Sequence, residues 1–192
     1  MATALVVRLV FWLWLGAAFV VGQQRLLQHL PPFAIPAIVL GLSALLVFSY
    51  FRLSAVSRWV DSLDLRTLVF CHVSRFVGIY FLVLYSRGVL PHDFAVPGGI
   101  GDIIVATGAL GLAFVPLTEP ALHRLVRIWN IVGLVDICLV VLTAARLNME
   151  NPFQMRAFTY LPLSLLPTFL VPLIISTHVV IFHRLTRQQP SA

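Results

Sequence analysis

Six long apolar segments, separated by short polar stretches, dominate the pattern of this 192-residue chain. Each segment is close to the ~20 residues that an α-helix needs to cross a hydrocarbon core. The segments cover residues 4–21, 33–51, 67–85, 99–117, 128–145 and 158–182. We therefore predict an all-α fold, a polytopic transmembrane helical bundle of about six helices that forms a single transmembrane domain over residues 1–192.

The composition agrees with a lipid bilayer as the main solvent. Hydrophobic residues make up 60% of the chain and charged residues 10%, whereas soluble domains carry about a quarter charged residues. The net charge of +6 comes entirely from an excess of arginine over acidic residues. These arginines lie mostly at the ends of apolar segments, where they anchor helices at the membrane surface. We therefore expect the bilayer, and no nucleic acid, as a partner.

The arginines also indicate an orientation. Eight lie on the side of the membrane that holds the N-terminus and four on the other side. Cytoplasmic loops of membrane proteins are rich in basic residues, so we expect both termini in the cytoplasm. The first segment could instead be a cleaved secretory signal, with Arg8 near its start and Gly22 at its end, but Trp12 and Trp14 favour an uncleaved first helix.

Arg8 lies near the start of its apolar segment, whereas Arg75 is left deep inside the membrane. Arg75 follows Arg66 by nine residues, and Asp136 follows Arg127 by nine residues. At 1.5 Å per residue both are about 13 Å from the same membrane surface. A charge at this depth needs a partner, so we predict an Arg75–Asp136 pair. The pair is either a lock between two helices or part of a polar pathway or ligand pocket.

Asp102 follows a glycine-rich run that begins at Pro97, where we expect a loop to enter the fourth helix. A carboxylate in the first helical turn is favoured by the helix dipole, so capping alone would explain Asp102. The glycines do not form a nucleotide-binding loop, because no Lys-Ser/Thr pair follows them. We expect Asp102 and Asp136 to lie too far apart in depth to act as a catalytic pair, which argues against a membrane-embedded hydrolase.

Two histidines share a second depth. His72 and His178 each lie six residues from an arginine that ends their segment, about 9 Å below the surface. Paired histidines on two helices are able to ligate a b-type haem, and His178 is also suited to a proton relay. The simpler expectation is that each histidine bonds a backbone carbonyl or a neighbour such as Ser176 or Asn130. We predict no cofactor.

The last apolar segment carries Pro162, Pro167 and Pro172. Each proline frees the carbonyl of the residue four positions earlier, which must find a partner or line a wet cavity. Interrupted helices of this kind occur at transport sites, although a bent helix is the commoner outcome. Cys71 and Cys138 have no partner at disulfide or metal spacing, so we expect neither a disulfide nor a metal site.

Four stretches carry a resemblance to a known family: Arg75-Phe-Val-Gly-Ile-Tyr-Phe-Leu, Leu90-Pro-His-Asp-Phe-Ala-Val-Pro-Gly-Gly-Ile-Gly-Asp102, Trp129-Asn-Ile-Val-Gly-Leu-Val-Asp136, and Leu166-Pro-Thr-Phe-Leu-Val-Pro-Leu, followed by His178. Together they resemble an uncharacterised family of small bacterial integral membrane proteins with six helices. The resemblance covers roughly the C-terminal two-thirds of the chain and implies a multi-pass protein of the bacterial inner membrane. It supplies no activity, but it draws attention to Arg75, Asp102, Asn130, Asp136 and His178.

The sequence therefore favours a small-solute or proton-coupled transporter or channel rather than an enzyme. Its path would be lined by Arg75, Asp102, Asn130, Asp136 and His178. Two alternatives remain open. One is a redox anchor that binds quinone, or haem through His72 and His178. The other is a non-catalytic accessory subunit of a membrane complex, or a homo-oligomer, in which the buried charges only hold helices together.

Overall fold

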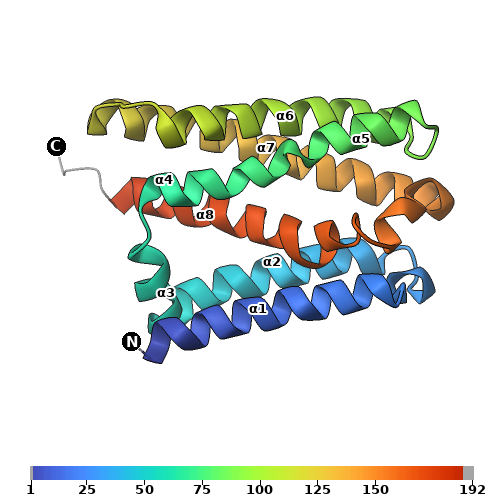
Figure 1. Ribbon diagram of the computed structural model, residues 1–192, viewed down its shortest axis with the longest axis horizontal. Helices are drawn as coiled ribbons and strands as arrows, with labels where there is room; N and C mark the ends of the chain where they lie inside the picture. The colour runs from blue at the N-terminus through green and yellow to red at the C-terminus, as the bar shows by residue number, and fades with distance from the viewer. Residues whose placement is uncertain (1, 188–192) are drawn as a thin grey trace. The chain divides into compact units, whose positions relative to one another are not determined.

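The computed structural model describes residues 2–187, which contain helices and no strand (Figure 1). The predicted all-helical fold is confirmed. Within the described chain, six helices are long and apolar enough to cross a membrane: Ala4–Gln23, Ala34–Arg52, Leu65–Ser86, His92–Phe114, Glu119–Glu150 and Leu166–Arg187. The chain forms two compact units. Unit 1 runs to Leu63 and includes Val141–Ser176, whereas unit 2 comprises Asp64–Val140 and the chain from Thr177 onward.

Unit 1 begins with two apolar helices, α1 (Ala2–Gln23) and α2 (Ala34–Arg52). A short 3-10 helix, η1 (Leu26–His29), lies between them. The polar stretch after α2 forms an additional short helix, α3 (Ser54–Asp61), where the hydropathy pattern indicated only a loop. The hydroxyl of Tyr50 donates to Asp61 Oδ1 at 2.9 Å, which fixes the end of α3 against α2.

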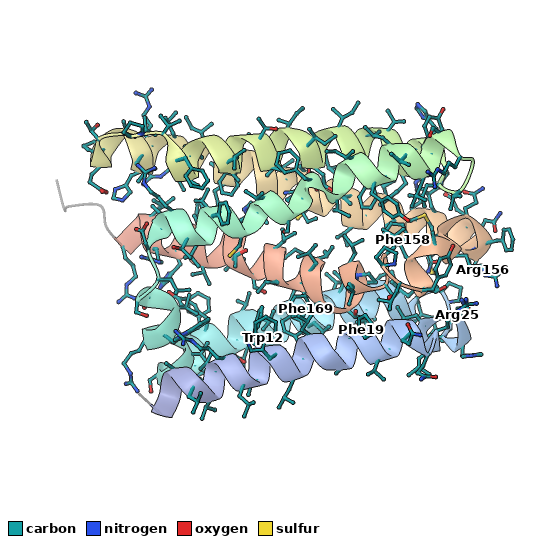
Figure 2. The ribbon with its side chains drawn as sticks, in the orientation of Figure 1. Trp12, Phe19, Arg25, Arg156, Phe158 and Phe169 are labelled. Atoms are coloured by element: carbon teal, nitrogen blue, oxygen red, sulfur yellow. The ribbon has the colours of Figure 1, made fainter. Side chains whose placement is uncertain are left out.

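The sixth apolar segment becomes a spanning helix later than its hydropathy predicts. A 3-10 helix, η3 (Pro152–Thr159), precedes a turn at 161–164, so the expected helix start at residue 158 is wrong. The span begins with a π-helical turn, η4 (Leu166–Leu170), and continues as α8 (Val171–Arg187). Proline supplies no backbone donor at 162 or 167, which explains why regular α-helix does not form there. Phe169 of this turn, labelled in Figure 2, packs on the rings of Phe11 and Trp14 of α1.

Unit 2 contains a span made of three consecutive pieces. They are α4 (Leu65–Phe70), the 3-10 helix η2 (Cys71–Phe76) and α5 (Val77–Ser86). α6 (His92–Phe114) packs beside α5 (Figure 1). The Glu119–Glu150 helix, α7, extends beyond the predicted range 128–145 at both ends and contributes to both units, as does α8.

The start of α6 corrects a second prediction. The helix begins at His92 rather than at Gly99 and passes through Pro97. The glycines that indicated a loop instead allow helices to touch. A Cβ added to Gly78 would lie 2.5 Å from the carbonyl oxygen of Gly99, and a Cβ on Gly99 would lie 2.8 Å from the carbonyl oxygen of Gly78. Only glycine permits this approach of α5 to α6.

Candidate functional site

Arg75 lies at the centre of a buried group of polar residues in unit 2. It is located in η2 and is 0% exposed. Its Nε donates to Asp102 Oδ1 of α6 at 2.6 Å, and its Nη1 donates to the carbonyl oxygen of Gly133 at 3.0 Å. Its Nη2 donates to Asp136 Oδ2 of α7. One guanidinium therefore joins three helical segments, and the predicted Arg75–Asp136 pair is present.

Asp102 takes a different place from the one expected. Because α6 begins at His92, Asp102 lies well inside the helix, and it binds Arg75 rather than capping the first turn. The expectation that Asp102 and Asp136 lie too far apart to act together is wrong, since both carboxylates contact the same guanidinium. Their exposure differs: the side chain of Asp102 is 4% exposed and that of Asp136 is 20% exposed.

Glycines bring the carboxylates within reach of Arg75. A Cβ on Gly78 would lie 2.7 Å from the Cβ of Asp102, and a Cβ on Gly101 would collide with the carboxylate of Asp136. Such distances are too short for ordinary side-chain contact. The backbones at these two positions must therefore be bare for the Arg75 contacts to form.

The 3-10 geometry of η2 places a histidine beside Arg75. In a 3-10 helix, side chains three residues apart lie directly above one another. His72 and Arg75 have this spacing, and both are fully buried. The ring of His72 packs on the ring of His178 from α8, with the two centroids 4.2 Å apart. The indole of Trp129 covers both rings, at 4.9 Å from His72 and 5.5 Å from His178.

Asn130 holds His178 at two points. Its Oδ1 lies 2.8 Å from Nδ1 of the imidazole, and its Nδ2 donates to the main-chain carbonyl of His178 at 3.1 Å. The expected hydrogen bond between His178 and Asn130 is thus present. Ser176, the other expected partner, donates instead to the carbonyl of Pro172 at 2.7 Å. His72 Nε2 lies 3.1 Å from the hydroxyl oxygen of Thr177.

The two imidazoles do not fit the axial ligation of a haem. Axial ligands bind the iron from opposite faces of the macrocycle, so the macrocycle separates them. Here the two rings are in direct contact, at 4.2 Å between centroids, and Nδ1 of His178 is bound to Asn130. Among the described residues, no group of three or more His, Cys, Asp or Glu is arranged to hold a metal ion.

Gly133 links the carboxylates to the histidines. Its carbonyl accepts from Arg75, and a Cβ at this position would lie 2.6 Å from Cε1 and 3.0 Å from Nε2 of His178. All five residues singled out from the sequence therefore come together in unit 2. We call this group, with His72, the inner polar cluster; its members are Arg75, Asp102, Asp136, Asn130, His72 and His178.

Sequence reasoning missed three neighbours of the inner polar cluster: Gly133, Trp129 and Thr177. A signal was available for Gly133, because Asn130, Gly133 and Asp136 recur every three residues and so follow one side of α7. Thr177 precedes His178 directly, yet nothing in its local sequence separates it from any other polar residue of an apolar helix.

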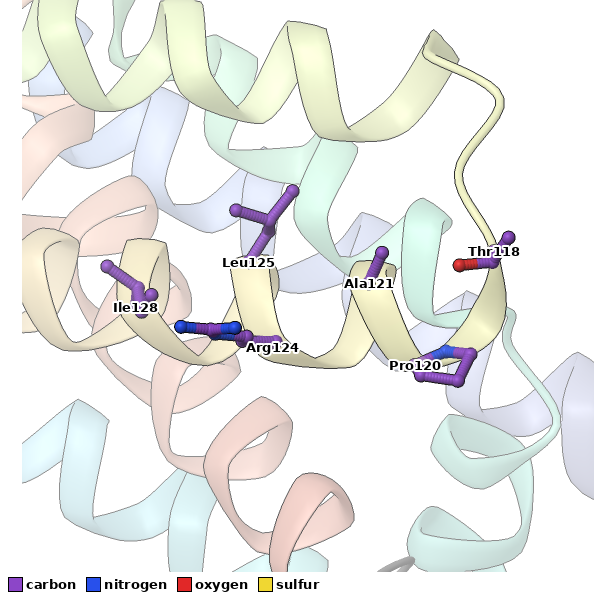
Figure 3. Close-up of a pocket in the computed structure, with 6 residues that line it drawn as sticks. All are labelled: Thr118, Pro120, Ala121, Arg124, Leu125 and Ile128. Carbon is purple, nitrogen blue, oxygen red and sulfur yellow. The ribbon is translucent and has the colours of Figure 1, made fainter.

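A separate hollow lies at the start of α7 (Figure 3). It has a volume of about 570 Å³, is open to the surface, and contains no member of the cluster. Its lining is mostly apolar and comes from Thr118, Pro120, Ala121, Arg124, Leu125 and Ile128.

The two cysteines, Cys71 and Cys138, are both exposed and free.

Residues 32–186 match a family described as Domain of unknown function (DUF8737). This range includes every member of the inner polar cluster. No curated protein and no solved structure matches the chain. The match agrees with the resemblance to an uncharacterised family that the sequence carries.

Proposed function

The chain belongs to the family described as Domain of unknown function (DUF8737), and from the geometry of unit 2 we propose that it is a proton-coupled membrane transporter or channel. The observation that carries this proposal is one buried guanidinium shared by two carboxylates. In this proposal, protons bind at the inner polar cluster while passing through unit 2.

Charge balance supports proton binding. With Asp102 and Asp136 both ionised, the group around Arg75 carries one excess negative charge. An uncompensated charge in a low-dielectric interior is strongly unfavourable. One bound proton makes the group neutral. The proton-free group and the proton-loaded group therefore differ by a single charge. Ionisable residues within membrane spans commonly mark proton relays for this reason.

The unequal exposure of the two carboxylates supports a route for the proton. Arg75 and Asp102 are almost completely enclosed, at 1% and 4% side-chain exposure, whereas Asp136 is 20% exposed. We assign Asp136 as the group that exchanges protons with the outside of unit 2. Arg75 and Asp102 are positioning residues, because they hold the carboxylate of Asp136 and set the charge around it.

The alternative of a purely structural lock explains less. One carboxylate is enough to neutralise one guanidinium and to fix the register of two helices. The second carboxylate adds a buried charge that packing does not require. An accessory role in a membrane complex predicts no proton movement at all, which separates it from the transport proposal.

We also propose the surroundings of the protein. We propose that both termini lie on one side, from the six candidate spans of the described chain, and that this side is the cytoplasm, from its excess of arginine. We propose the inner membrane of a bacterium as its location, from the resemblance noted above. The lipid bilayer is its solvent, and a homo-oligomer or a partner within the membrane is compatible with the exposed apolar faces of its helices.

The test is proton flux in vesicles. Purified protein is reconstituted into lipid vesicles that contain a pH-sensitive dye, and a potassium diffusion potential drives protons inward. The wild-type protein is expected to carry protons faster than empty vesicles. Asp136→Asn is expected to reduce the flux to the level of empty vesicles while preserving the helical circular dichroism and the gel-filtration profile.

Two further variants make the test specific. Asp102→Asn keeps the Arg75–Asp136 pair but removes the excess charge, so it should also abolish flux. Asp64→Asn changes an exposed carboxylate that makes no side-chain cap on α4, so it should leave flux unchanged. The proposal is overturned by wild-type flux equal to that of empty vesicles. It is also overturned by full flux in a folded Asp136→Asn or Asp102→Asn variant.

A further inference from the structure

Two ring nitrogens of unit 2 have no hydrogen-bond partner among residues 2–187, which the structure describes. They are Nδ1 of His72 and Nε2 of His178. Both side chains are 0% exposed. Buried polar atoms of side chains are nearly always paired, and an exception calls for an explanation. We look for the explanation in what these nitrogens bind, since the other nitrogen of each ring already lies within hydrogen-bond distance of Asn130 or Thr177.

The tautomer of His178 follows from its contacts with Asn130. The amide nitrogen of Asn130 donates to the carbonyl of His178, so the amide oxygen faces the imidazole. An amide oxygen only accepts hydrogen bonds. Nδ1 of His178 must therefore carry the hydrogen, and Nε2 of the neutral ring is a bare lone pair.

The bare nitrogen lies against the backbone of α7. A Cβ at Gly133 would lie 3.0 Å from Nε2, so only glycine lets the ring approach α7 this closely. The carbonyl of Gly133 is bound by Arg75. Gly133 thus packs against the ring of His178 and also accepts a hydrogen bond from the guanidinium that binds both carboxylates.

We propose that Nε2 of His178 is a second proton-binding site, beside the carboxylates, on the path of the proposed transporter. The inference rests on the proposed function and names a further residue for it. The proton comes from a protonated carboxyl group of the cluster: its O–H bond breaks, an N–H bond forms at Nε2, and a carboxylate and an imidazolium result. The same proton leaves from Nε2, because Asn130 retains the hydrogen on Nδ1.

The charges around His178 support a shared proton. The nearest ionisable groups are His72, which packs on the ring of His178, and Arg75, which binds Asp102 of α6 and Asp136 of α7. With Arg75 positive and both carboxylates negative, one proton makes the cluster neutral whether it lies on a carboxylate or on His178. A proton is therefore able to change place within the cluster without creating a buried net charge.

Nuclear magnetic resonance tests this site without any transport. Protein labelled with ¹⁵N-histidine is placed in lipid nanodiscs, and His178 is identified by the signal missing from His178→Gln. At neutral pH, His178 is expected to show a protonated Nδ1 and a bare Nε2. In Asn130→Leu this preference should be lost. A His178 that carries its hydrogen on Nε2 in the wild-type protein overturns the inference.

Flux measurements test the role of the site. His178→Gln retains a polar side chain but cannot carry a proton, and its flux is expected to fall to that of empty vesicles. His29→Gln changes an exposed histidine of η1 and should behave as wild type. Wild-type flux in folded His178→Gln overturns the inference while leaving the roles of Asp102 and Asp136 intact. If Asp136→Asn loses flux while His178→Gln keeps it, the inference about His178 fails and the proposed function stands.

Discussion

The indole nitrogen of Trp14 donates to the main-chain carbonyl of Thr168 at 3.0 Å. This carbonyl is the one that Pro172 cannot bind, because proline has no backbone donor for the residue four positions earlier. The contact joins α1 to the π-helical turn η4 within unit 1. A side chain from another helix thus replaces a hydrogen bond that the sixth span lacks.

Replacing Trp14 by phenylalanine should weaken unit 1. The Trp14→Phe variant keeps an aromatic ring against Phe169 but leaves the carbonyl of Thr168 unpaired. We expect the free energy of unfolding to fall by about 1 kcal/mol. Denaturation in mixed detergent micelles measures it. Trp12→Phe is the matched control, since Trp12 is 64% exposed, and equal stability of the two variants would contradict the assignment.

The contact between α5 and α6 predicts a different response at two glycines. Gly78→Ala places a methyl group 2.5 Å from a backbone oxygen and should lower the free energy of unfolding by about 1–3 kcal/mol. Gly111→Ala on α6 meets no atom within 4 Å. It should leave stability unchanged or raise it by up to ~1 kcal/mol, because alanine favours the helix. A stable Gly78→Ala variant would show that the two helices do not pack this closely.

Removal of Arg75 should be more harmful than removal of the whole charged group. Arg75→Leu leaves the carboxylates of Asp102 and Asp136 without a counter-charge and should cost about 3–5 kcal/mol of stability. Adding Asp102→Asn and Asp136→Asn to Arg75→Leu removes those charges. We expect the triple variant to unfold at a higher detergent fraction than Arg75→Leu. A triple variant that is less stable than the single one would contradict this explanation.

Arg66 should stabilise the end of α6. Its Nη1 donates to the carbonyls of Leu112, Ala113 and Val115 at 2.8, 3.2 and 2.9 Å. The last carbonyls of a helix lack partners of their own, and a cation there also favours the helix dipole. Arg66→Gln should therefore lower the free energy of unfolding by about 1 kcal/mol. Amide hydrogen exchange near Phe114 should accelerate in this variant and remain unchanged in the exposed control Arg58→Gln.

The positions of Arg75 and Asp136 were predictable because helical rise is nearly constant. Counting residues from a surface arginine gives depth in any apolar helix, and two opposite charges at one depth have few other partners. The same counting placed His72 and His178 at one level, and the two rings are in contact. Depth alone could not predict that Asn130 contacts Nδ1 of His178, since this contact depends on the rotation of α7.

The role of Asp102 was not predictable from its neighbours. A proline followed by glycines is typical of a turn, and here it lies inside α6 because the glycines pack against α5. Tertiary contact overrides local preference at this point. The fate of residues 158–165 had the opposite cause: their hydropathy fits a spanning helix, but the missing donors at Pro162 and Pro167 prevent one.

The 3-10 stretch Cys71–Phe76 also sets the phase of the helix that follows it. Six residues that advance by 120° instead of 100° turn α5 by about 120° relative to an uninterrupted α-helix. The third span therefore consists of two α-helical halves whose relative rotation is fixed by η2. The rotation of α5 aligns Gly78 with α6, while His72 and Arg75 remain stacked within η2. Inserting or deleting a single residue there would turn the two halves out of alignment, even though length and hydropathy would hardly change.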